Sequence, residues 1–147
     1  MQAEDPYDLT RFLEAQHRCY TRVLEELAAG AKTSHWMWFI FPQLRGLGAS
    51  ATARRFGLSG LEEARAYLAH PILGARLREC ARGVLAVEAR SAHQIFGSPD
   101  DLKLRSCLTL FAAAASPSPE DQVFSAALAR YYGGEPDPLT VQLLAHS

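Results

Sequence analysis

The chain has 147 residues, of which 48% are hydrophobic and 21% are charged. A chain of this length buries a core without disulfides or a structural metal, and its charge content is too low for a disordered polypeptide. Fifteen basic and sixteen acidic residues leave a formal net charge of −1. The overall charge therefore gives no basis for bulk nucleic-acid binding or for attraction to a membrane surface, although it allows a local basic groove.

The cysteines and the apolar runs predict a cytoplasmic protein. Cys19, Cys80 and Cys107 lie far apart and form no C-x-x-C pair, so we expect free thiols rather than disulfides or a zinc site. The first residues lack the basic start and apolar run of a secretory signal. The apolar run from Trp36 to Phe41 is far too short to span a bilayer. We expect a single cytoplasmic domain over residues 1–147, without membrane association.

Four helix starts carry the same pair of residues. An Asp or Ser precedes a Pro, so that the side-chain oxygen caps backbone N–H groups and the Pro occupies the first helical position, where its missing donor costs nothing. Ser59 with Glu62 predicts a fifth start, of the capping-box type. The four pairs are Asp5-Pro6, Ser98-Pro99, Ser118-Pro119 and Asp137-Pro138.

In chain order, these starts and the apolar spacing predict a series of helices. Apolar residues at three- and four-residue steps predict one helix of about five turns from Leu9 to Leu27, closed by Gly30. Further helices are expected over residues 61–69, 71–90, 91–96, 99–115 and 119–132, with a short last one from residue 138.

Nothing in the sequence predicts a sheet. No run of residues alternates between apolar and polar and is bounded by turn residues. Between residues 32 and 57 the pattern does not decide between helix, loop and glycine-rich turn. We therefore predict an all-α fold, a single multihelical domain of about seven to nine helices.

The first segment with candidate functional residues is KTSHWMWFIFPQLRGLGAS, residues 32–50, which contains both tryptophans of the chain. One interpretation is a core element onto which the outer helices pack, because aromatic residues dominate core energetics. The other is a small-molecule pocket, since polar groups stand in an apolar wall. Its Gly-Leu-Gly lacks the spacing of a dinucleotide-binding fingerprint, and we expect no cofactor. The polar groups are Lys32, Ser34, His35 and Gln43.

The second segment is GSPDDLKLRSCLTLF, residues 97–111. One interpretation is a capped amphipathic helix with Lys103 in solvent. The other is a functional site, since Asp101 at a helix start with Lys103 and Ser106 about one turn on suits proton transfer or phosphate contact. Lys32 and Lys103 are the only lysines among the fifteen basic residues, and one lies in each segment. This distribution suggests a need for a compact ammonium group in both places.

Several stretches of the sequence resemble those of a known protein family. The stretches DPYDLTRFLEAQ, SHWMWFIFPQLRGLG, EEARAYLAHPILGARLREC, IFGSPDDLKLRSCLTLF and YYGGEPDPLT are similar to a bacterial family known as the domain of unknown function numbered eighteen-ten, whose members are often labelled calpastatin. The similarity covers residues 5–144. It implies a multihelical orthogonal fold without a sheet, and no established activity. The family's motif positions correspond here to Lys32, Ser34, His35, Trp36, Trp38, Gln43, Asp101, Lys103, Ser106 and Thr109.

The first functional hypothesis is a small-molecule site for a flat, anionic ligand such as a nucleotide or an ADP-ribose-like compound. A hydrolase acting on such a ligand is its more specific version. His35, Asp101 and Lys103 are the expected catalytic residues, with His35 as acid or base and Lys103 also as an anion contact. No spacing predicts a metal site. The expected ligand-binding residues are Lys32, Ser34, Trp36, Trp38, Gln43 and Ser106.

The second hypothesis is a non-catalytic helical interaction or accessory module. In this case the aromatic segment is core, and an exposed apolar groove takes a partner helix. No sequence feature excludes it, and the sequence leaves the oligomeric state open.

Overall fold

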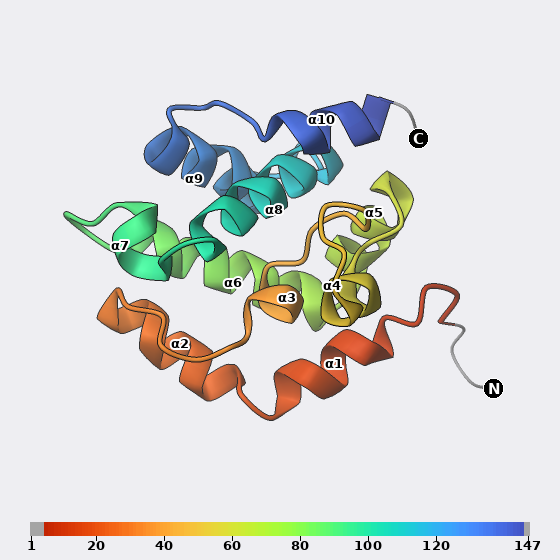
Figure 1. Cartoon of the computed structure of the whole chain (residues 1–147), viewed down its shortest axis with the longest axis horizontal. Coiled ribbons are helices and arrows are strands. Elements are labelled where there is room, and N and C mark those ends of the chain that lie inside the picture. The colour runs from red at the N-terminus through yellow and green to blue at the C-terminus, as the bar shows by residue number, and fades with distance from the viewer. Residues whose placement is uncertain (1–4, 146–147) are drawn as a thin grey trace.

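The structure, a computed structural model, describes residues 5–145 and consists of helices and loops (Figure 1). Within this range no strand occurs, and Leu44 and Leu58 form an isolated β-bridge. The prediction of an all-α fold without a sheet is confirmed. The helices of residues 5–145, ten α-helices and one 3-10 helix, are α1 (Thr10–His17), α2 (Tyr20–Ala29), α3 (Met37–Ile40), α4 (Ala51–Phe56), α5 (Leu61–Ala69), α6 (Leu73–Ala86), α7 (Ala92–Phe96), α8 (Asp100–Ala114), η1 (Pro119–Asp121), α9 (Gln122–Tyr132) and α10 (Pro138–Ala145).

The central element is α8, which contacts α5, α7, α9 and α10. Figure 1 shows α6 and α8 in the middle of the molecule, with α9 and α10 above them and α1 and α2 below. From Leu104 to Phe111 every residue except Arg105 is buried. A helix that is buried around most of its circumference belongs in a core, so α8 is a core helix after its first turn and not the amphipathic surface helix that we considered.

Several predicted helix ends are confirmed. Asp137 accepts hydrogen bonds from the backbone N–H and the hydroxyl of Thr140, at 2.9 Å and 2.7 Å, at the start of α10. Gly30 and Gly133 end α2 and α9 with φ angles of 69° and 64°. These angles lie in the left-handed region, which glycine adopts without steric cost. The predicted short helix over residues 91–96 is α7, and Ser91 caps it.

The predicted helix over residues 9–27 is instead two helices. The chain turns at Arg18 and Cys19, between the end of α1 and the start of α2. The apolar spacing fits both halves, but α1 packs against α3 whereas α2 packs against α6. One straight helix could not reach both partners. Figure 1 shows α1 and α2 as the two arms of a V, with α3 above its opening.

Four helix starts differ in detail from the prediction. Ser98 and Ser118 form no side-chain cap hydrogen bond, and α8 begins at Asp100 and not at Pro99. The other two starts keep their caps with a changed partner. The Asp5 carboxylate accepts hydrogen bonds from the backbone N–H and hydroxyl of Thr10, at 3.0 Å and 2.8 Å, so the first helix begins at Thr10 and not directly after Asp5. Ser59 donates to Glu63 and not to Glu62, from its backbone N–H at 2.8 Å and its hydroxyl at 2.9 Å. In both cases the cap is present but its partner lies further along the chain.

The end of α6 is set by a side chain of α9. We predicted this helix to continue to residue 90, but it ends at Ala86. The guanidinium of Arg130 donates to the backbone carbonyls of Leu85 and Val87. Carbonyl groups at a helix end lack intrahelical partners, and Arg130 supplies donors for them.

The segment that the sequence left undecided contains α3 and α4. Trp36, Met37, Ile40 and Phe41 are at most 3% exposed and join the main core cluster. The aromatic segment therefore has a core role. In the part of the chain that the structure describes, no helix combines the length and the apolar character needed to cross a membrane.

Candidate functional site

A buried carboxylate anchors the loop that carries His35. Glu26 on α2 accepts hydrogen bonds at its Oε1 from the backbone N–H groups of Thr33 and Ser34, at 2.8 Å and 3.0 Å, and from Nε1 of Trp36 at 3.0 Å. Its Oε2 accepts from the Ser34 hydroxyl at 2.6 Å. Burial by itself raises the pKa of Glu26, but these hydrogen bonds outweigh it and lower the pKa to about 2. The carboxylate is thus charged at neutral pH and fixes the loop against α2.

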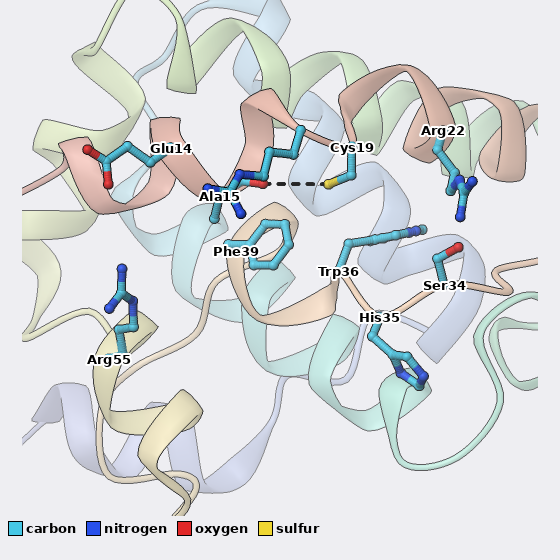
Figure 2. A pocket seen from close by; sticks show the side chains of 10 residues that line it. Glu14, Ala15, Cys19, Arg22, Ser34, His35, Trp36, Phe39 and Arg55 are labelled. Atoms are coloured by element: carbon cyan, nitrogen blue, oxygen red, sulfur yellow. Dashed lines mark hydrogen bonds between the residues drawn. The ribbon is translucent and has the colours of Figure 1, made fainter.

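Beside this loop lies a hollow of about 670 Å³, which Figure 2 shows from close by. Its walls come from α1, α2, the start of α3 and the end of α4. Phe39 is the half-buried aromatic ring of the hollow, whereas Trp36 is 1% exposed and contributes little more than an edge. The volume lies in the range of small-molecule pockets. The lining residues are Glu14, Ala15, Arg18, Cys19, Arg22, Ser34, His35, Trp36, Phe39 and Arg55.

Three arginines give the hollow its charge. The side chains of Arg18, Arg22 and Arg55 are exposed, and none of them forms an ion pair or a hydrogen bond with another residue of the range 5–145. Several other arginines are engaged within the protein: Arg11, for example, contacts Glu63 at 2.9 Å, and Arg78 contacts Asp121 at 2.6 Å. The three guanidinium groups are therefore available to a ligand, and the planar guanidinium matches phosphate and carboxylate oxygens.

His35 and Cys19 add two further groups to the wall. The His35 side chain is exposed and has no hydrogen-bond or ion-pair partner among the described residues. The Cys19 thiol donates to the carbonyl of Ala15 at 3.7 Å. Burial raises the pKa of Cys19, so its thiol is a poor nucleophile at neutral pH. Of these two groups, His35 is the better suited to exchange protons.

The two lysines meet at a different place, on Asp100 at the start of α8. Nζ of Lys32 lies 2.7 Å from Oδ2 of Asp100, and Nζ of Lys103 lies 3.3 Å from Oδ1. Each ammonium also lies over a ring, Lys32 at 5.1 Å from the centroid of Trp36 and Lys103 at 3.8 Å from that of Trp38. We call Lys32, Asp100, Lys103 and Trp38 the lysine cluster. The side chain of Lys32 is 7% exposed, so its charge needs the carboxylate.

The remaining predicted residues belong to neither place. Oδ2 of Asp101 lies 3.3 Å from Nδ1 of His93, which is exposed. The Ser106 hydroxyl donates to the carbonyl of Leu102 within α8 at 3.2 Å. Gln43 is 7% exposed, next to the isolated bridge. Asp101 is thus not the carboxylate between the lysines.

The predicted site residues therefore fall into separate groups. Ser34, His35 and Trp36 line the hollow, and Lys32, Trp38 and Lys103 form the lysine cluster with Asp100. Sequence reasoning missed the three arginines, Glu14 and Phe39 of the hollow. On the single helix that the sequence predicts over residues 9–27, Arg18 and Arg22 would share a face, and this spacing is the signal that could have indicated part of the hollow.

No donor set for a metal ion stands out. Among residues 5–145, no group of three or more His, Cys, Asp or Glu side chains lies close enough to hold one.

The combination of this helical order with these motifs is found in other proteins. A family model described as "Protein of unknown function (DUF1810)" matches residues 6–144. The chain belongs to this family. The family resemblance that the sequence motifs indicated is thereby confirmed. No curated protein matches the chain.

A solved member of the same fold is the conserved hypothetical protein Rv1873 from Mycobacterium tuberculosis. It shares 58% sequence identity with this chain and superposes with a TM-score of 0.92. The match covers 96% of this chain and 99% of the mycobacterial chain. The complete helical arrangement is therefore shared with a bacterial relative, whose description assigns no activity.

Proposed function

We propose that the protein binds a flat, anionic small molecule of the nucleotide class in the hollow between α1, α2 and α3. The observation that carries this proposal is the set of guanidinium groups of Arg18, Arg22 and Arg55, which line the hollow without a carboxylate partner. Charge-assisted hydrogen bonds from guanidinium to phosphate are among the strongest that a protein surface forms. Phe39 supplies an aromatic surface for the uncharged part of the ligand.

The electrostatics of the hollow favour an anion. The residues that line it include one acid, Glu14, and three arginines, so the positive charges outnumber the negative one. Glu26 is close by, but its charge is taken up by hydrogen bonds from the loop over residues 33–36. The nearly neutral chain thus has a local basic site, in agreement with a small ligand and not with bulk nucleic acid.

Binding is tested with the purified chain, by isothermal titration calorimetry with AMP, ADP and ADP-ribose. At least one ligand should bind, and replacing Arg22 by alanine should weaken it about tenfold, the loss expected for one charge-assisted contact. The matched control is Arg82→Ala, since Arg82 is exposed on α6 and lies outside the hollow. Absence of binding, or equal weakening by Arg82→Ala, would refute the proposal and leave the helical interaction module as the better account.

Hydrolysis of the bound ligand is the more specific version of this proposal. We assign proton transfer to His35, whose exposed side chain is among the lining residues and has no hydrogen-bond or ion-pair partner among the described residues. His35→Ala should then abolish release of phosphate or ribose while binding persists. Catalytic roles for Asp101 and Lys103 stay predictions, because neither residue lines the hollow.

A further inference from the structure

The cationic groups of the hollow are not gathered at one point. Figure 2 shows Arg55, from α4, on one side of the hollow and Arg22, from α2, on the other, with Phe39 between them. We infer that the ligand carries two anionic groups held apart by its uncharged body, one for Arg22 and one for Arg55. This inference rests on the proposed function and specifies its ligand.

Arg22 and Arg55 lie on opposite sides of Phe39, so a ligand with anionic groups at two positions suits the pair better than a ligand with one. Guanidinium and phosphate gain most when they touch, because water and salt screen exposed charges over about 8 Å at physiological ionic strength. A ligand whose phosphates are joined to one another, such as a nucleoside diphosphate, engages the arginine on one side and leaves the arginine on the other side in solvent. A ligand with charges at two separate positions engages both and places its uncharged body over Phe39.

Both ends of the hollow also open into neighbouring depressions. Arg55 lines a second hollow of about 320 Å³, together with Arg11 and Arg45. Arg22 lines another of about 350 Å³, together with Thr33 and with the carboxylates of Glu25 and Glu26. Each depression has the volume for a phosphate-sized group. At the Arg55 end, Arg11 is engaged by Glu63 and Arg45 donates to the carbonyl of Gly57, so Arg55 is the guanidinium there without a hydrogen-bond partner among the described residues.

Glu14 lies on the Arg55 side of the hollow in Figure 2. Its carboxylate opposes a second negative charge at that end, because like charges repel across a partly exposed site. The Arg55 end therefore suits one compact anionic group. Glu14→Gln should tighten the binding of a ligand with charge at both ends.

Two isomers test the inference directly: adenosine 3′,5′-bisphosphate and adenosine 5′-diphosphate have the same composition and differ in where the second phosphate is attached. Isothermal titration calorimetry should show the bisphosphate binding at least about tenfold more tightly, the gain from one additional charge-assisted contact. Arg55→Ala should reduce this preference to about twofold or less. Arg82→Ala, outside the hollow, should leave it unchanged.

The outcomes separate the inference from the proposed function. If the two isomers bind equally well and Arg22→Ala weakens both, the hollow binds nucleotides but not through charges at two ends, and the inference is overturned. If neither isomer binds and no other nucleotide does, both are overturned. Exposed arginines change stability little when replaced, and thermal unfolding of each variant verifies that the fold is intact.

Discussion

The Glu26 carboxylate offers the sharpest test of how the candidate site is built. Replacing Glu26 by glutamine keeps the size of the side chain and an oxygen acceptor but removes the charge that Thr33, Ser34 and Trp36 donate to. The folded protein lowers the pKa of Glu26 from 4.5 to about 2. At about 1.4 kcal/mol for each pH unit, this difference corresponds to roughly 3 kcal/mol of folding free energy.

The sign of this contribution fixes its pH dependence. Because the pKa is lower in the folded state, the stabilisation is complete above the unfolded pKa of about 4.5 and is lost as the pH falls toward 2. Glu26→Gln should therefore be less stable than the natural chain by roughly 3 kcal/mol at pH 7, and the difference should narrow steadily below pH 4.5.

Urea unfolding followed by tryptophan fluorescence measures this difference, since Trp36 is buried and bonded to Glu26. Glu25→Gln is the matched control, because Glu25 is the neighbouring residue on α2 and is exposed. It should change stability by less than about 0.5 kcal/mol. A Glu26→Gln variant as stable as the natural chain at pH 7, or a difference that persists undiminished at pH 3, would refute the reasoning.

Two further substitutions test contacts outside the hollow by the same measurement. Gly74→Ala should destabilise the fold by about 2 kcal/mol or more, because a Cβ at this position would lie 2.1 Å from the carbonyl oxygen of Leu68. Gly60→Ala is the control, because the space around Gly60 is open and the added Cβ meets no atom within 4 Å. Asp100→Asn should lower the free energy of unfolding by about 2 kcal/mol, because it leaves the largely buried ammonium of Lys32 without its carboxylate. An unchanged free energy of unfolding would show that the lysine cluster does not stabilise the fold.

The helices could be predicted because their ends are local. Ser91 and Asp137 cap the helices that follow them, and Gly30 and Gly133 end theirs, through bonds within a few residues. The break at residues 18–19 could not be predicted, because it depends on which distant helices receive α1 and α2. Apolar spacing describes a face but not its partner.

The candidate site was predictable only in part, for a related reason. Adjacent residues on a helix point about 100° apart, so Asp100 and Asp101 face different neighbours, and the sequence does not tell which one meets Lys32. Arg22 and Arg55 looked like ordinary surface cations, since an exposed arginine has the same sequence signature whether or not it borders a hollow. His35 was identified because it stands beside the core tryptophans.

The bend between α1 and α2 has a consequence for how the proposed ligand site would evolve. A single straight helix presents a convex surface, whereas two helices that meet at an angle enclose a space between them. Arg18 and Cys19, at the turn between α1 and α2, are part of the lining of that space. The width of that space depends on how α1 seats on α3 and α2 on α6. Substitutions in those remote contacts would widen or narrow the opening, so ligand preference could shift without any change in the residues that touch the ligand.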